Sequence, residues 1–181
     1  METSPAVSKK NWALYVALAA PLLMIIMVAA FIYLPGIGKT PQHNFLYMSG
    51  SNVYSDVYGY PAAGYQVSSG HLVYTPPPVN QNQNIYPPLA TDVHFYVYDV
   101  KTNQATEVAL AQAETYNLDS SNISADGYSV QQGSGGGDFL FGSSGDYNSW
   151  FLKGHNRSTK LNLKLSGGTS YANFRFLGWT E

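Results

Sequence analysis

Aromatic side chains flanked by amides and glycines are the residues of this sequence best suited to binding chemistry. The chain holds 15 tyrosines and three tryptophans, and aromatic residues make up 14% of it. Rings beside Asn and Gln side chains suit protein interfaces and the stacking of sugar rings alike. The candidate binding residues are Tyr54, Tyr58, Tyr60, Tyr86, Tyr147, Trp150 and Trp179. The competing interpretation is that half or more of such rings simply pack the core of a small domain.

Residue types that carry catalysis are present, but they do not form a recognisable motif. The four histidines are His43, His71, His94 and His155. They share no metal-ligand spacing, and His94 falls in the most strand-like segment, where a hydrogen-bonded structural role is expected. The absence of cysteine excludes disulfides, thiolate metal sites and a cysteine nucleophile. We therefore predict a protein that is not an enzyme, with no catalytic residue, metal or cofactor.

Glycine- and aspartate-rich turns resemble ligand-binding loops only superficially. The run at 133–138, Gly-Ser-Gly-Gly-Gly-Asp, lacks the Lys-Ser or Lys-Thr ending of a phosphate-binding loop. Asp126, Asp138 and Asp146 could gather round a calcium ion, but their spacing is not that of an EF-hand. A hairpin loop is the simpler interpretation of the glycine run.

Charge is sparse, which excludes one class of partner. Charged residues make up 11% of the chain, and after residue 34 there are seven Lys or Arg against ten Asp or Glu. A surface that follows nucleic-acid phosphates needs clustered positive charge. No nucleic-acid partner is expected.

An apolar N-terminal segment precedes the region that would hold the aromatic residues. Residues 12–34 contain no charge, and as a helix they would extend roughly 34 Å, enough to cross a hydrocarbon core of about 30 Å. The segment therefore predicts a single-pass transmembrane helix that acts as a signal anchor. Cleavage after Ala30, as in a signal peptide, stays open as the alternative.

The residues that flank this segment predict its orientation. The candidate membrane-interface anchors are Lys9, Lys10, Trp12, Tyr15 and Tyr33. Lys or Arg before a span favours a cytoplasmic N-terminus. The predicted location is the cell membrane, with the C-terminal domain periplasmic or extracellular.

The predicted domain organisation has four parts, and its fold class is an all-β exported domain preceded by one transmembrane α-helix. The parts are a cytoplasmic tail (1–11), the transmembrane helix (12–34), a linker (35–43) and an extracytoplasmic β domain (44–181). Within the last part, a Ser69-Gly70 turn predicts a hairpin, and 93–100 is rich in aromatic and β-branched residues. Residues 160–165 alternate Lys or Asn with Leu, which predicts a strand with one buried face. Residues 110–114 have the composition of a short helix.

Two short motifs carry a resemblance to a known family. Ser124-Ala125-Asp126-Gly127 and the segment 97–103, Val-Tyr-Asp-Val-Lys-Thr-Asn, are the motifs. They resemble the Ser-Pro-Asp-Gly turn and the Tyr-Asp…Thr-Gly turn of TolB-like β-propeller blades, with Ala for Pro and Asn for Gly. The resemblance covers about residues 65–179 and implies about two blades, whereas propellers close with about four to eight. We therefore expect an open β-sandwich, or a propeller-blade-like fragment that completes its sheets with another subunit.

These features together predict an interaction protein. The expected function is a membrane-anchored, extracytoplasmic, non-catalytic structural or interaction subunit of an envelope or surface assembly. The expected partners are the membrane and one or more proteins, including a second copy of the chain. The alternative function is a glycan-binding module whose aromatic loops stack on sugar rings.

Overall fold

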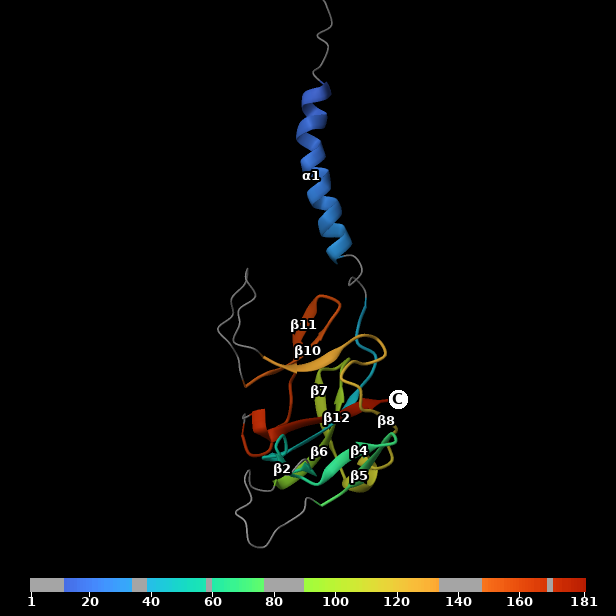
Figure 1. Ribbon diagram of the computed structural model, residues 1–181, viewed down its shortest axis with the longest axis vertical. Helices are drawn as coiled ribbons and strands as arrows, with labels where there is room; N and C mark the ends of the chain where they lie inside the picture. The colour runs from blue at the N-terminus through green and yellow to red at the C-terminus, as the bar shows by residue number, and fades with distance from the viewer. Residues whose placement is uncertain (1–11, 34–38, 58–59, 77–89, 134–147, 169–170) are drawn as a thin grey trace, which may run out of the picture. The chain divides into compact units, whose positions relative to one another are not determined.

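The computed structural model describes residues 12–33, 39–57, 60–76, 90–133, 148–168 and 171–181 of the 181-residue chain. The chain divides into two compact units, Met1–Lys39 and Thr40–Glu181. In its described residues, the first unit is a helix and the second is built mostly of β-strands (Figure 1). The predicted cytoplasmic tail at 1–11 and the glycine run after Gly133 lie outside the described residues.

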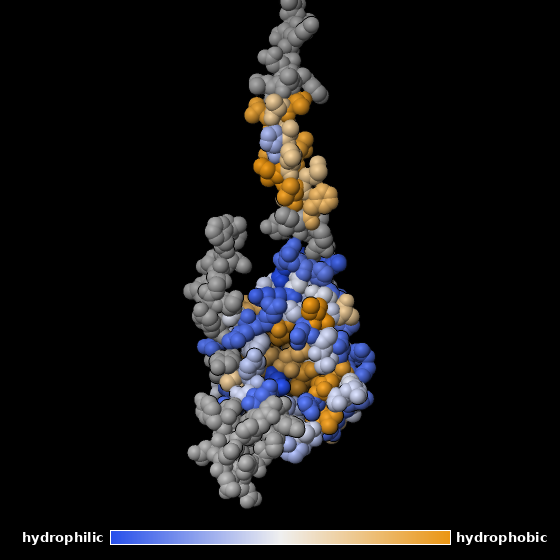
Figure 2. Space-filling view, in the orientation of Figure 1, coloured by the Kyte–Doolittle hydropathy of each residue, from blue (hydrophilic) through white to orange (hydrophobic). Residues whose placement is uncertain are grey.

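Helix α1 (Trp12–Tyr33) forms the first unit, with Pro21 inside it. Figure 2 shows hydrophobic residues along the helix, and large side chains such as Leu18 and Phe31 are exposed. The side chains that are described in α1 are those of residues 15–31.

The transmembrane prediction is therefore corrected. Within the described part of the chain, no helix combines the length and the apolar character needed to cross a membrane. The fold class with a transmembrane helix, the single-pass signal anchor and the cell-membrane location are all wrong on this finding. Of the predicted membrane-interface anchors, Trp12, Tyr15 and Tyr33 lie in α1, and Lys9 and Lys10 lie outside the described residues.

A five-stranded antiparallel sheet organises the second unit, in the order β7-β6-β1-β12-β8. Its strands are β1 (Phe45–Ser51), β6 (Thr91–Asp99), β7 (Gln104–Val108), β8 (Leu118–Asp119) and β12 (Phe174–Thr180). The central strand, β1, is buried along nearly its whole length because other elements cover both faces of the sheet. Phe45 of β1 lies opposite Tyr98 of β6 and Trp179 of β12.

One face of this sheet carries an aromatic core. Phe45 stacks on Tyr98 with ring centroids 4.9 Å apart, and Tyr47 stacks on Tyr96 at 5.1 Å. A second sheet, in the order β11-β10-β9, contributes to the same core through Trp150 and other residues. Its strands are β9 (Ser129–Gln132), β10 (Trp150–Gly154) and β11 (Arg157–Lys160).

The other face carries a more aliphatic core that includes Leu46, Met48 and Leu72. It is covered by the hairpin of β4 (Tyr65–Ser68) and β5 (His71–Tyr74) and by the short helix α2 (Leu110–Ala113). Ser69 and Gly70 have positive φ values of 50° and 80°, as a two-residue hairpin turn requires. The predicted hairpin and the predicted short helix are both confirmed. The pair β2 (Asp56–Val57) and β3 (Tyr60–Pro61) and the 3-10 turn η2 (Tyr171–Asn173) complete the described elements.

The predicted strand at 160–165 is only partly correct. Its burial does alternate, because Leu161 is buried and Leu163 and Leu165 are half-buried, while Asn162 and Lys164 are exposed. However, β11 ends at Lys160, and residues 161–165 belong to no sheet. The leucine pattern therefore predicted which side chains face the core, but not how the backbone is paired.

Side-chain hydroxyls bind the backbone of this segment in place of a neighbouring strand. Every second backbone N–H donates to a hydroxyl on the five-stranded sheet. These bonds run from Asn162 N to Tyr98 Oη (3.0 Å), from Lys164 N to Tyr47 Oη (3.0 Å) and from Ser166 N to Ser49 Oγ (2.8 Å). We call Tyr98, Tyr47 and Ser49 the hydroxyl ladder. It attaches a sixth extended segment, residues 161–166, to the face of the sheet.

Candidate functional site

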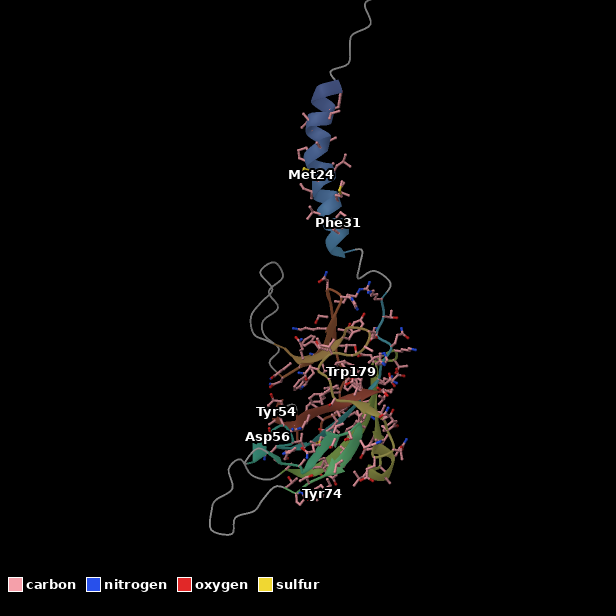
Figure 3. All side chains as sticks on the ribbon, turned by 45° about the vertical axis from the view of Figure 1, so that its right-hand side comes forward. Met24, Phe31, Tyr54, Asp56, Tyr74 and Trp179 are labelled. Atoms are coloured by element: carbon pink, nitrogen blue, oxygen red, sulfur yellow. The ribbon has the colours of Figure 1, made fainter. Side chains whose placement is uncertain are left out.

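A cleft of about 570 Å³ lies within the second unit, in the size range of small-molecule sites. Its walls come from strands β2, β9, β10 and β12 and from two residues outside these strands. The lining residues comprise Val130, Gln131 and Gln132 of β9, Trp150 of β10, Phe174, Arg175 and Phe176 of β12, and Tyr54, Asp56 and Asn122. Tyr54 and Asp56 lie close together at one edge of the unit, well apart from Trp179 (Figure 3).

A tight turn after β1 places Tyr54 and Asp56 at this cleft. Asn52 has a φ of 62°, in the left-handed region that Asn tolerates, and its carbonyl accepts a hydrogen bond from Ser55 N at 3.2 Å. Tyr54 N donates to Ala172 O at 3.1 Å, which ties the turn to the start of β12. The turn therefore holds the Tyr54 backbone beside the segment that leads into β12, the strand of Arg175, and Tyr54 is 53% exposed.

Arg175 and Asp56 form an ion pair in the cleft. Arg175 Nη1 donates to Asp56 Oδ1 at 2.7 Å, and it also approaches Tyr54 O at 3.5 Å. Their side chains are 25% and 55% exposed, so water screens the pair and its net contribution to stability is small. The two charges cancel, and the other lining residues carry none. The cleft therefore offers strong donors and acceptors without a net charge.

Trp150 lines the cleft with a largely buried side chain. Its side chain is 8% exposed, and its ring packs on Phe174 with centroids 4.2 Å apart. Among the described residues, its Nε1–H has no hydrogen-bond partner. By contrast, the indole N–H of Trp179 donates to Ser121 O at 3.1 Å. Leaving a buried donor unpaired costs about 1–3 kcal/mol.

Amide side chains complete the polar lining. Asn122 and Gln131 are exposed, and each amide carries both a donor and an acceptor. Gln131 Nε2 donates to Ser129 Oγ at 2.9 Å, which orients this side chain on β9. The cleft thus combines an exposed ring, an ion pair, amides and a buried indole N–H. Such an arrangement can hold a polar ligand by hydrogen bonds and ring contact.

No protein-family model, curated protein or solved structure matches the chain. The similarity to TolB-like propeller blades therefore stays a prediction. Both motifs that carry it form turns, and Gly127 and Asn103 have positive φ values of 84° and 57°.

The predicted binding residues are only partly brought together. Tyr54 and Trp150 line the cleft, whereas Trp179 is 2% exposed and lies elsewhere in the aromatic core. Tyr60 belongs to β3, and nothing is described of its side chain. The other three, Tyr58, Tyr86 and Tyr147, lie outside the described residues.

The sequence analysis missed the polar half of the cleft. Arg175 and Asp56 entered only as charges, and the amides of Asn122 and Gln131 were not considered. One signal for Arg175 was present, because it stands between two Phe residues in an otherwise apolar strand. A lone cation in such a strand indicates a specific partner.

A second titratable cluster lies on β6 and β7, outside the cleft. His94 Nδ1 lies 2.7 Å from Glu107 Oε1, and His94 Nε2 lies 3.2 Å from Asp92 Oδ1. The hydrogen bond to Glu107, followed by that to Asp92, raises the pKa of His94. The predicted hydrogen bonding of His94 is confirmed, whereas its structural role stays a prediction. Within the described residues, no group of acidic or histidine side chains is arranged to hold a metal ion.

Proposed function

We propose that this chain is a non-catalytic interaction protein that recognises its ligand or partner in the cleft of the β unit. The observation that carries the proposal is the set of polar side chains that line one cleft, namely the Arg175–Asp56 ion pair and the amides of Asn122 and Gln131. The exposed Tyr54 ring lies in the same cleft and supplies a further contact.

The side chains of the cleft favour binding over turnover. Arg175 holds the Asp56 carboxylate at 2.7 Å, which fixes the position of this acceptor. Tyr54, on the turn after β1, lines the same cleft. Fixed donors and acceptors of this kind orient a bound molecule.

The test is a binding survey with the full-length protein and variants of the cleft. Uncharged peptides, neutral oligosaccharides and nucleotides are titrated by calorimetry, and the recovered ligand is analysed by mass spectrometry. We expect at least one class to bind and to be recovered unchanged. Arg175→Ala should weaken that binding at least tenfold, because it removes a charge-assisted donor.

Tyr74→Ala is the matched control, because Tyr74 is exposed to nearly the same extent as Tyr54 (57%) but lies outside the cleft. Its affinity should equal that of the wild type. Two results contradict the proposal: conversion of the ligand to a product, or binding that is equal in Arg175→Ala and the wild type.

A further inference from the structure

We propose that strand β11 (Arg157–Lys160) binds a short acidic peptide, which adds to its free edge as a further strand. This surface lies apart from the cleft, so the proposal goes beyond the function proposed above. β11 and β9 are the two edges of the three-stranded sheet, and the cleft is lined by β9 and by no residue of β11. Two independent observations carry the proposal: an exposed strand edge and a local excess of positive charge.

The backbone of β11 leaves one side of the strand open. Leu161 N donates to Trp150 O at 2.9 Å, so the odd-numbered residues of this segment direct their backbone groups toward β10. Successive residues of a strand direct these groups to opposite sides, and the N–H and C=O of Ser158 therefore point away from β10. All four residues of β11 are exposed, and no described strand pairs with this edge.

The next even-numbered amides show what this side of the segment binds when a partner is present. Asn162 N donates to Tyr98 Oη, and Lys164 N donates to Tyr47 Oη. The hydroxyl ladder begins at Asn162, so it does not reach Ser158. Within the described part of the chain, the outward backbone groups of Ser158 are therefore available to a second strand.

Positive charge is concentrated around this edge. Four of the seven Lys or Arg residues after residue 34 fall within residues 153–164, and residues 147–180 contain no Asp or Glu. The four are Lys153, Arg157, Lys160 and Lys164. No described carboxylate forms an ion pair with Lys153, Arg157 or Lys164. A positive surface of this kind attracts an anionic partner.

The strand register places lysines on the outward face of the sheet. Phe151 lies opposite Lys160 and Lys153 lies opposite Ser158, so Lys153 and Lys160 share one face. The other face of β10 is buried in the aromatic core. Side chains on one face of a strand recur about every 6.7 Å. A peptide with acidic residues at alternate positions would therefore place all its carboxylates on the lysine face.

A peptide matches both observations, whereas other anions match only the charge. Extended peptides add to a sheet through main-chain hydrogen bonds, and their alternate side chains give specificity. Ser158 presents one donor and one acceptor, as such a pairing requires. A phosphate chain has no N–H to donate to the Ser158 C=O. We therefore assign the edge to an acidic peptide.

The test titrates the full-length protein by calorimetry with an extended peptide that alternates Glu and Thr. The comparison ligands are the Lys-Thr counterpart, the Glu-Thr peptide methylated at every amide nitrogen, and inorganic polyphosphate. We expect millimolar or tighter binding of the Glu-Thr peptide, weakened by added salt, and no binding of the Lys-Thr peptide. The methylated peptide keeps its charge but has no N–H donors, so it should bind about tenfold more weakly.

Ser158→Pro tests strand addition from the side of the protein. The Ser158 N–H points away from β10, and Pro is tolerated where the N–H side of an edge strand faces solvent. The variant should bind the Glu-Thr peptide about tenfold more weakly. Ser158→Ala is the matched control, because it keeps the N–H and should bind as the wild type does. If thermal unfolding shows that Ser158→Pro is not folded, the methylated peptide decides the outcome.

Charge is tested by the combined substitution Lys153→Gln, Arg157→Gln and Lys164→Gln. We expect this variant to bind the Glu-Thr peptide about tenfold more weakly at low salt, because the attraction to the peptide carboxylates is removed. Lys101→Gln is the control. Lys101 is exposed but lies in the turn between β6 and β7, so its loss should leave the affinity unchanged.

Three results would overturn the proposal. They are no binding of the Glu-Thr peptide, equal binding of its methylated form, and tighter binding of polyphosphate that ignores Ser158→Pro. Arg175→Ala separates this surface from the cleft, because it should leave the affinity for the Glu-Thr peptide unchanged. If Arg175→Ala abolished that binding while the triple charge variant retained it, the peptide would lie in the cleft. The β11 proposal would then fail, and the proposed function would stand.

Discussion

Replacing Tyr47 by Phe should destabilise the β unit by about 1–3 kcal/mol without changing its apolar packing. The Tyr47 side chain has no exposed surface, and its hydroxyl makes two hydrogen bonds to one residue. It accepts from Lys164 N at 3.0 Å and donates to Lys164 O at 3.1 Å. Each such bond contributes about 0.5–1.5 kcal/mol net, which gives the stated range for the pair.

Denaturant unfolding of the full-length protein measures this loss. Trp150 and Trp179 are buried in the β unit, so tryptophan fluorescence reports its unfolding. Tyr74→Phe is the control, because Tyr74 is exposed and lies outside the hydroxyl ladder. The control should unfold at the wild-type denaturant concentration, whereas Tyr47→Phe should unfold at a lower one.

Hydrogen exchange locates the effect. The amide of Lys164 should exchange faster in Tyr47→Phe, while the amide of Asn162, bound to Tyr98, should change less. An unchanged free energy of unfolding together with an unchanged Lys164 exchange rate would refute the reasoning. It would mean that leucine burial alone holds residues 161–166 on the sheet.

The same variant alters the response to alkali. Burial raises the pKa of Tyr47 above its ordinary value of 10.0, against the opposing hydrogen bond from the Lys164 backbone. The folded state therefore holds this proton more tightly than the unfolded state. The resulting stability is present below pH 10 and is lost as the pH rises further. Tyr47→Phe should make the fall in stability above pH 10 shallower than in the wild type.

Three further changes test other parts of the structure. Because the pKa of His94 is raised, its protonation contributes stability that is full below pH 6.5 and is lost as the pH rises above that value. His94→Gln should therefore flatten the pH dependence of the melting temperature above pH 6.5. Gly50→Ala should cost about 1–3 kcal/mol in denaturant unfolding, because a Cβ there would lie 2.6 Å from Asp92 O on the neighbouring strand. Trp179→Phe should destabilise more than Trp150→Phe in the same assay, because only the Trp179 indole N–H has a partner among the described residues; equal losses would contradict this.

Short sequence patterns predicted the elements whose conformation depends mainly on neighbouring residues. The Ser69-Gly70 turn and the strand-forming composition of 93–100 correspond to the β4–β5 hairpin and to β6. The alternation at 160–165 predicted which leucines are buried. It could not reveal that the backbone partners are hydroxyls more than 60 residues away in the sequence, because nothing local specifies them.

The cleft was harder to predict from the sequence than the strands. Asp56 and Arg175 are 119 residues apart in the chain, and only the pairing of β1 with β12 brings their neighbourhoods together. Aromatic composition did indicate Tyr54 and Trp150. It could not separate them from Trp179, whose indole lies in the core, because all three are aromatic residues with polar neighbours.

The hydroxyl ladder fixes the register of the segment that it binds. The amides that it binds are two residues apart along residues 161–166, and the leucines alternate with the same period. A shift of one residue would turn the leucines to water and place the other set of amides opposite the three hydroxyls. A shift of two residues would again bury leucines and place amides of the same alternating set opposite the hydroxyls. The stretch should therefore tolerate a change in length of two residues, whereas the insertion of a single residue should disrupt its packing and its hydrogen bonds.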